Sequence, residues 1–260
     1  MAKALGAPVD VVCVPSALAG QDWPPRVDAQ KVAADTGSRL QSRGLSVRTH
    51  VPEGDAALAL VALAEDQGAQ MIVMGNKGMT GMRRLVGSLP NRVSHQARCD
   101  VLIIPTESPS LAEFTGGSIV VGTDGSGRAS GAVKKAIQLA KALGGDLHIV
   151  SRSKLSESPE AALSVAAGMA AAEGVTANTY VRHGDTADAL IEVAQKNDAA
   201  IIIVGGKGMR AEERDWFGNV PDRLSHQGAA SVLIVFTEDG GDDASVEAEE
   251  AVPAGEEAAS

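Results

Sequence analysis

The chain has 260 residues, which corresponds to about two domains at the usual ~100–200 residues per domain. Hydrophobic residues make up 44% and charged residues 22%, so the composition excludes a globally disordered protein. Aromatic residues reach only 2%, which predicts an aliphatic core and argues against a nucleic-acid surface built from stacking side chains. No apolar run approaches the ~18 residues of a membrane span, and we recognise no signal peptide. The two cysteines, Cys13 and Cys99, do not make a disulfide scaffold, so we expect a cytoplasmic protein.

The net charge of −10 is concentrated near the C-terminal end. Residues 238–260 contain nine acidic and no basic side chains, which leaves 24 acidic and 23 basic residues in 1–237. We therefore expect 238–260 to be a disordered acidic tail. Such a tail either increases solubility without a specific partner or screens a surface and repels nucleic acid, and its composition favours the first interpretation.

One sequence pattern occurs twice along the chain. Residues 2–6 (AKALG) recur at 140–144, and other segments recur at a spacing close to that: Gly54-Asp55 as Gly184-Asp185, Lys77-Gly78-Met79 as Lys207-Gly208-Met209, Arg92 as Arg223, and Val101-Leu102-Ile103 as Val232-Leu233-Ile234. A period this long indicates two copies of one domain. We predict domains at 1–106 and 118–237, joined by a linker at 107–117.

In the second copy, apolar strands alternate with helical segments. In chain order the pattern predicts a strand at Ser118–Val121, a turn at Gly122–Gly127, a helix at Ala129–Leu143, a strand at Leu147–Val150, a helix at Pro159–Glu173, a strand at Val175–Val181, a helix at Thr186–Asn197, a strand at Ala200–Val204, a helix at Pro221–Gln227 and a strand at Ser231–Phe236. This alternation predicts an α/β fold with a parallel, doubly wound sheet.

A glycine-rich loop follows a buried strand in both copies. The first runs from Met71 through Gly75 and Gly78 to Gly87-Ser88, and the second from Ile201 through Gly205 and Gly208 to Gly218-Asn219. Each loop ends in a capping residue and a proline, the signature of a helix start. Glycines allow an anion to approach the backbone, and free amides at a helix start can bind it, although glycines also simply turn the chain. The repetition favours a phosphate or nucleotide site.

The glycine-loop pattern and the segment Val120-Val-Gly-Thr-Asp-Gly-Ser126 together resemble the universal stress protein family. The resemblance covers nearly the whole chain except the tail. It implies two tandem five-stranded sheets in the order 3-2-1-4-5, paired through their last strands within the chain or in a homodimer. The pairing edges would be Val101–Pro105 and Val232–Phe236. The family's role in stress response implies a regulatory module rather than an enzyme, with an unidentified protein partner.

ATP-binding members of this family hold the adenosine near the first-strand aspartate and the phosphates against the glycine loop. The resemblance therefore implies that ATP or another adenine nucleotide binds to residues of both copies. These residues are Gly75, Lys77, Gly78, Gly87 and Ser88 in the first copy, and Thr123, Asp124, Val150, Gly205, Gly208, Gly218 and Asn219 in the second.

Both copies depart from the family pattern. The first has one residue fewer between Gly78 and Gly87, and the second has Asn219 in place of serine. The second loop also carries Glu212, Glu213 and Asp215, which would repel phosphate, where the first has Arg83 and Arg84.

The first copy also lacks any equivalent of Ser118–Leu139, because residues 2–6 align with the end of that helix. The missing strand would be central in the family's order. Its absence would leave two interior strands with unpaired backbone groups, each costing about 1–3 kcal/mol if buried. We expect either that the native start lies upstream or that another chain fills the gap.

Other candidate residues have simpler interpretations. His95 and His226 occur in Ser-His-Gln after each loop, and we favour a structural role on a helix face over catalysis. Cys13 and Cys99 are interpreted as ordinary thiols rather than redox sensors. No cluster has metal-ligand spacing.

Three functions remain open. The leading one is an adenine-nucleotide-binding regulatory module. The second is an interaction protein of the same fold that has lost nucleotide binding. The third is a slow ATP hydrolase, which is disfavoured because the loop sequence offers no general base and no Lys-Ser/Thr P-loop ending.

Overall fold

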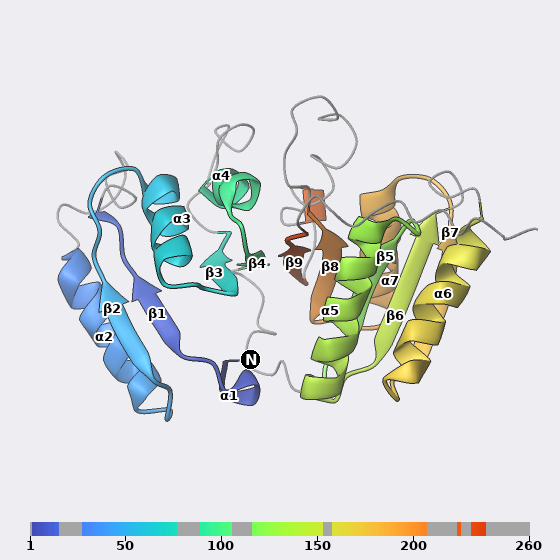
Figure 1. Cartoon of the computed structure of the whole chain (residues 1–260), viewed down its shortest axis with the longest axis horizontal. Helices are drawn as coiled ribbons and strands as arrows, with labels where there is room; N and C mark the ends of the chain where they lie inside the picture. The colour runs from blue at the N-terminus through green and yellow to red at the C-terminus, as the bar shows by residue number, and fades with distance from the viewer. Residues whose placement is uncertain are drawn as a thin grey trace, which may run out of the picture.

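The structure is a computed structural model of the whole chain, and it describes residues 2–15, 28–76, 89–105, 116–152, 158–206, 223–224 and 230–237. None of the described helices is both long enough and apolar enough to cross a bilayer. Strands alternate with helices through both repeats, and in the second repeat the apolar patterning predicts this alternation (Figure 1).

The first repeat contains four helices and four strands among the described residues. They are α1 (Ala2–Leu5), β1 (Val9–Val12), α2 (Ala29–Gln41), β2 (Val47–His50), α3 (Ala56–Asp66), β3 (Met71–Gly75), α4 (Leu89–Gln96) and β4 (Asp100–Ile104). Aspartates cap two of the helices: Asp28 accepts hydrogen bonds from the amides of Gln30 and Lys31 at α2, and Asp55 caps α3 in the same way.

The second repeat contains a complete set of five strands. Its elements are β5 (Ile119–Thr123), α5 (Gly127–Leu143), β6 (Leu147–Arg152), α6 (Pro159–Ala172), β7 (Ala177–Arg182), α7 (Thr186–Lys196), β8 (Ile201–Gly205) and β9 (Ser231–Val235). The helix expected at Pro221–Gln227 lies outside the described residues except for Arg223 and Leu224, which are helical.

Seven strands form one sheet in the order β3-β4-β9-β8-β5-β6-β7. Within the second repeat this gives the order 3-2-1-4-5, with all neighbours parallel, so the expected α/β doubly wound fold is confirmed. The turn expected at Gly122–Gly127 was placed too early. Gly122 and Thr123 still belong to β5, because they continue its pairing with Val150 and Ser151 of β6.

The two repeats are joined by antiparallel pairing of β4 with β9. The pairs are Val101 with Ile234, Leu102 with Leu233, and Ile103 with Val232. Leu102 and Leu233 occupy matching places in the two repeats, so the junction is centred on a pseudo-twofold axis. The intramolecular form of the expected last-strand pairing is therefore present in the chain.

A buried carboxylate reinforces the junction between the repeats. Asp100 of β4 is 5% exposed, and its Oδ1 accepts a hydrogen bond from the Phe236 amide at 3.0 Å. Its Oδ2 lies 2.8 Å from Lys135 Nζ on α5. One side chain of the first repeat thus binds both the end of β9 and a helix of the second.

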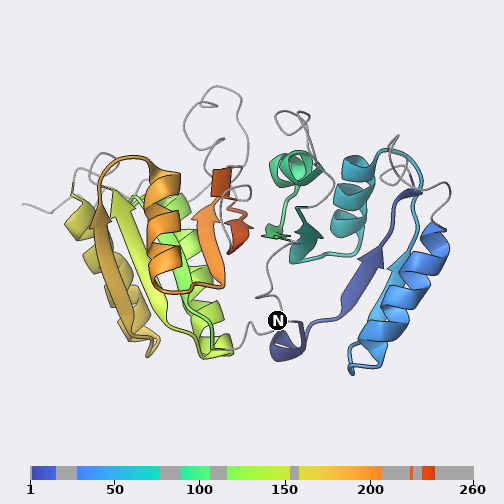
Figure 2. The ribbon, with the colours of Figure 1, turned by 180° about the vertical axis from the view of Figure 1, so that it is seen from behind.

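Helices cover both faces of the seven-stranded sheet. Figure 1 shows α5 and α6 in front of the second repeat, and Figure 2 shows α7 on the opposite face. On the α7 face, one apolar cluster extends across both repeats and includes side chains of α3 and α4. On the other face, the helical side chains of the apolar cluster come, among the described residues, from α5 and α6 alone. The described helices of the first repeat therefore contribute to only one of the two cores.

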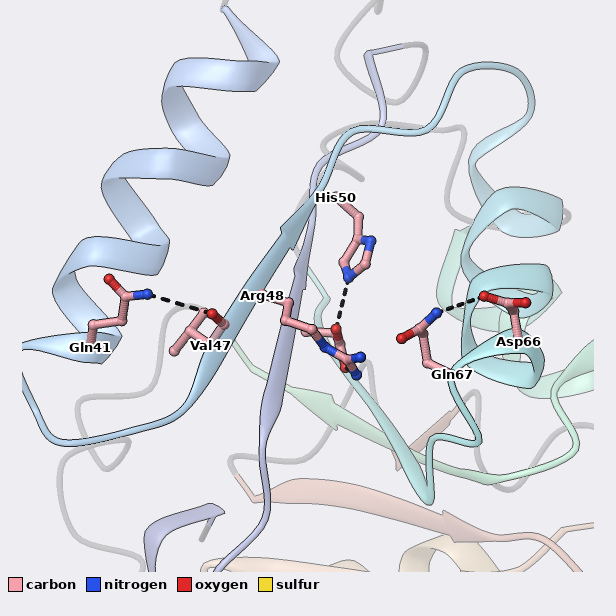
Figure 3. Close-up of polar contacts among 7 residues, drawn as sticks. Gln41, Val47, Arg48, His50, Asp66 and Gln67 are labelled. Atoms are coloured by element: carbon pink, nitrogen blue, oxygen red, sulfur yellow. Dashed lines mark hydrogen bonds and ion pairs between the residues drawn. The ribbon is translucent and has the colours of Figure 1, made fainter.

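The strands β1 and β2 form a separate two-stranded parallel sheet. Asp10 of β1 holds the pair together, with Oδ2 2.8 Å from Arg48 Nη2 and Oδ1 2.7 Å from His50 Nε2 (Figure 3). Burial of Asp10 raises its pKa, but the bonds to Arg48 and His50 outweigh it, so the net pKa is lowered. The Gln41 amide donates to the Val47 carbonyl at 3.5 Å and links α2 to β2.

The gap expected in the sheet of the first repeat is present among the described strands. Residues 2–5 form a single helical turn, and among the described strands none lies between β1 and β3. All four residues of β1 are only partly buried, so its free edge groups are not fully withdrawn from solvent. This exposure lowers the penalty that unpaired backbone groups would incur in a closed core.

Replacing Asp100 with alanine should lower the free energy of unfolding by about 1–3 kcal/mol, because it leaves the Phe236 amide and the Lys135 ammonium without their acceptor. Urea unfolding measures this effect. The control is Glu173→Ala, which removes an exposed ion pair to Lys141 on the same helix α5 and should cost less than about 1 kcal/mol. Equal losses in the two variants would contradict a special role for Asp100.

Candidate functional site

A pocket lies at the carboxyl ends of β5, β6 and β8 in the second repeat. The chain leaves β5 through α5 on one face of the sheet and enters β8 from α7 on the other. Open α/β sheets bind ligands where the crossovers diverge in this way. The pocket is open to solvent and holds about 660 Å³ of space free of protein atoms, counted to its open mouth.

Two kinds of side chain line this pocket. The apolar wall is formed by Val150, Ala189, Leu190 and Val204, with Ala129 at the start of α5. Polar groups gather at the strand ends and helix starts: Thr123, Asp124, Ser126, Arg128, Arg152 and Thr186. An apolar wall beside a cationic polar end suits a ligand with a flat apolar part and an anionic part.

The turn after β5 is held by its own side chains. Asp124 Oδ1 accepts from the Ser126 amide at 2.9 Å, and Thr123 Oγ1 accepts from the Gly125 amide at 3.2 Å. Gly125 has φ +83°, a conformation that glycine adopts without strain. Ser126 then caps α5 by accepting from the Ala129 amide at 3.2 Å. The turn therefore directs the N-terminal end of α5 towards the pocket.

The glycines at the end of β8 allow close packing against α5 and β9. A Cβ on Gly205 would lie 3.2 Å from the Arg128 carbonyl oxygen, and one on Gly206 would lie 2.8 Å from Ile234 Cγ2. These glycines thus have a packing role in addition to any ligand contact. The pocket can have its present shape only if position 205 carries no bulky side chain.

Two arginines at the pocket were not identified from the sequence. Arg128 is exposed in the first turn of α5, and Arg152 is the last residue of β6. Arg152 Nη1 donates to the Gly184 carbonyl at 2.6 Å and so holds the turn that precedes α7. The sequence contained a usable signal for Arg152, because it lies two residues beyond Val150 on a parallel strand whose end meets that of β5.

The structure brings together four of the expected site residues: Thr123, Asp124, Val150 and Gly205. Gly75 is the last residue of β3 in the first repeat and is exposed. Among the described strands, no counterpart of β5 lies beside β3, so Gly75 has no neighbour equivalent to the β5 turn. The remaining predicted residues lie outside the described part of the chain: Lys77, Gly78, Gly87, Ser88, Gly208, Gly218 and Asn219. The loop charges at Arg83, Arg84, Glu212, Glu213 and Asp215 also lie outside it.

An aspartate–arginine pair recurs beside the site and explains part of the repeated sequence. Asp185 caps α7, and its Oδ1 lies 2.7 Å from Arg223 Nη1. In the first repeat Asp55 caps α3 and receives two bonds from Arg92, at 2.7 and 2.9 Å. Each arginine follows the glycine loop in sequence, so the pair ties the helix after the loop to the start of the preceding helix.

These pairs lower the pKa of both aspartates. The Arg92 hydrogen bond, with help from the Leu58 and Ala57 amides, lowers the pKa of Asp55 to about 2. Burial raises the pKa of Asp185, but the amides of Asp188 and Ala187 and the charge of Arg223 outweigh it, so the net pKa is lowered. Both caps are therefore carboxylates at neutral pH.

The cysteines fit the interpretation as ordinary thiols. Burial raises the pKa of Cys13, and burial together with the Asp100 charge raises the pKa of Cys99. A raised pKa reduces the thiolate fraction that redox chemistry requires. His95 lies exposed on α4, and its expected structural role remains a prediction, while His226 lies outside the described residues.

Stability should fall as the medium is acidified through the titration range of Asp55. Its pKa is depressed, so its contribution is complete above the ordinary value of 3.8 and is lost as the pH falls towards about 2. Asp55→Asn should therefore be less stable than wild type at about pH 5, and the difference should shrink towards pH 2. Urea midpoints measured across this range test the expectation. Asp35→Asn, at an exposed site on α2, is the control, and a difference independent of pH would contradict the assignment.

Comparison with known proteins gives a consistent picture. The family model described as "Universal stress protein family" matches residues 1–105 and 117–235. A universal stress protein of Mycolicibacterium smegmatis is 26% identical over 224 residues, covering 80% of this chain and 74% of that protein. A universal stress protein of Methanocaldococcus jannaschii is 35% identical over 78 residues, which is 30% of this chain. The chain spans about half the length of this relative and of a Bacillus subtilis relative that it also matches.

A solved structure supports the same fold. The crystal structure of a universal stress protein from Archaeoglobus fulgidus superposes with a TM-score of 0.73 at 20% identity, covering 91% of this chain and 89% of that one. At this identity the similarity establishes the fold alone.

Proposed function

Because this chain belongs to the universal stress protein family, we propose that it is a stress-response regulatory module whose second repeat binds an adenine nucleotide. The observation that carries the proposal is the pocket at the ends of β5, β6 and β8, where an apolar wall adjoins two arginines and a capped helix start. Val150 and Leu190 offer a surface for a flat base. Arg128, Arg152 and the amides at the start of α5 offer charge and donors for phosphate.

We expect binding without rapid turnover. Asp124 is the one carboxylate among the described lining residues, and its Oδ1 is already bonded to the Ser126 amide. A general base must reach the attacking water, and an oxygen engaged in the turn is poorly placed for that role. A nucleotide in the pocket would instead change the surface that α5 and the turn after β5 offer to a protein partner.

We place the proposed binding site in the second repeat because, within the described part of the chain, only this repeat has all the elements that line the pocket. Thr123, Asp124 and Arg128 come from the β5–α5 unit, and the described part of the first repeat contains no counterpart of β5. An interaction protein without nucleotide binding is the second candidate. The repulsive acids Glu212, Glu213 and Asp215 in the second loop favour it.

Isothermal titration with ATP, ADP and AMP should show saturable binding to the full chain, and GTP tests selectivity for the base. Arg128→Ala should weaken ATP binding by about tenfold while adenosine binding changes little, because the lost group interacts with phosphate. Arg98→Ala, an 80% exposed arginine of the first repeat, should leave both affinities unchanged. Equal effects of the two arginine variants would refute the assignment of Arg128.

The two repeats can be compared with matched glycine variants. Gly205→Val places a side chain where even a Cβ lies 3.2 Å from the Arg128 carbonyl, so it should abolish nucleotide binding. Gly75→Val changes the matching position in the first repeat, which is exposed, and should leave binding intact. Circular dichroism establishes that both variants remain folded. Loss of binding in Gly75→Val alone would place the site in the first repeat, and no titration in wild type would favour the interaction protein.

A further inference from the structure

A histidine is buried in the second repeat and is not among the residues that line the pocket. His148 of β6 is 5% exposed, and its Nδ1 lies 3.0 Å from the hydroxyl oxygen of Tyr180 on β7. Its Nε2 is inaccessible to solvent and has no hydrogen-bond partner among the described residues. In either neutral tautomer, therefore, only one ring nitrogen is paired. The other lowers the stability of the core, a penalty that an apolar side chain would avoid.

His148 lies on the face of the sheet that α7 covers (Figure 2). Side chains alternate along β6, and Val150 belongs to the apolar cluster on the α7 face, whereas Leu147 and Ile149 belong to the cluster beneath α5 and α6. On β5 the residue paired with His148 is Val120, which is fully buried. The imidazole is thus enclosed by β5, β7 and α7, and water reaches Nε2 only when this packing opens.

The nearest charged groups belong to β7 and α7. The Arg182 guanidinium lies 5.2 Å from the centroid of the Tyr180 ring, whose hydroxyl is the partner of His148. Arg182 Nε lies 3.7 Å from Glu192 Oε1 on α7, so this carboxylate is already paired with a cation. A second cation at His148 would therefore lie near the positive charge of Arg182 and would have no carboxylate of its own.

The other elements around His148 provide no acceptor for its second nitrogen. Strand β5 has no titratable side chain, and Arg152, the last residue of β6, is bonded to the Gly184 carbonyl. The other charged residues of α7 are Asp188, which is bonded to Arg223, and Lys196, which is exposed. Burial lowers the pKa of His148, and the charge of Asp146, just before β6, opposes this effect only in part.

The first repeat has a different pair at the matching positions. The repeat spacing makes Asp10 the counterpart of His148 and His50 the counterpart of Tyr180. Asp10 Oδ1 lies 2.7 Å from His50 Nε2, and the two side chains are 21% and 24% exposed. A carboxylate accepts a hydrogen bond from a protonated imidazole, so this pair tolerates acid. The second repeat has a neutral, enclosed pair in the same place.

We propose that His148 is an acid-sensitive switch: its protonation requires water to enter between β6 and α7, and this loosens the wall that α7 provides to the pocket. An imidazolium donates from both nitrogens, and Nε2 has no acceptor while the packing is closed. Val150 and Leu190 line the pocket and share one apolar cluster with Tyr180. The effect on nucleotide affinity rests on the proposed function, whereas the opening itself does not.

The pH dependence of unfolding tests the switch. The pKa of His148 is lowered in the folded chain, so the stability is complete above the ordinary value of 6.5 and falls below it. The unfolding equilibrium constant measured in urea should therefore gain up to about tenfold per pH unit between pH 6.5 and pH 5. This range lies above that in which Asp55 and Asp185 titrate.

Two variants of His148 isolate its contribution. His148→Gln keeps a partner for the Tyr180 hydroxyl but does not titrate, so this gain should disappear. His148→Met makes the same test with an apolar side chain if the glutamine variant does not fold. His183→Gln, at an exposed histidine of the same repeat, is the matched control and should keep the wild-type pH dependence.

Hydrogen exchange, corrected for its intrinsic pH dependence, locates the opening. The amides of β7 and α7 should lose protection from pH 7.5 to pH 5 in wild type but not in His148→Gln, while those of β9 should not change. The dissociation constant for ATP should rise over the same range in wild type alone.

Equal pH dependence of unfolding in wild type and the His148 variants would overturn the proposal, as would constant protection of α7. Opening of α7 with an unchanged ATP affinity would overturn the link to the pocket. Opening in a chain that binds no nucleotide at any pH would support the switch and contradict the proposed function, so the two failures are distinguishable.

Discussion

The antiparallel pairing of β4 with β9 is the interaction on which the rest of the structure depends. It joins two strands of the first repeat to the five strands of the second in one seven-stranded sheet, in which the five other strand pairs are parallel. Asp100 adds a second link, because its two oxygens bind the backbone of Phe236 and the ammonium of Lys135. Without this junction, β3 and β4 would form an isolated pair, which is marginal in water.

The junction also determines which surfaces of the first repeat are covered. On the α7 face, side chains of α3 and α4 belong to the same apolar core as those of α7. On the other face Leu102 of β4 is buried in the apolar cluster to which α5 contributes, whereas Val73 of β3 is 55% exposed. The first repeat is thus partly completed by the second. Its remaining open edge follows from the absence of a counterpart to β5 between β1 and β3 among the described strands.

Unlike the shared core, the candidate site is built from one repeat, because all of its described lining residues belong to the second repeat. The β5 turn, the end of β6 and the start of α7 meet where the crossovers diverge. Arg152 and Arg223 hold the start of α7 through the Gly184 carbonyl and the Asp185 carboxylate. Residues that repeat between the two halves, such as Asp55 and Asp185, serve this local geometry in both. Residues of the β5–α5 unit are what distinguish a half with a pocket from a half without one.

The sequence by itself determined the repeat, the alternation of strands with helices and most element positions, because apolar periodicity and capping residues are local signals. Resemblance to the family supplied the strand order and four residues of the pocket. Tertiary structure alone decided that Arg128 and Arg152 reach the same pocket, since residues on different strands meet only when the sheet forms. It also decided that the last strands of the two repeats, β4 and β9, pair within the chain. The physical reason is that strand pairing is non-local, so no single stretch of sequence specifies which strands become neighbours.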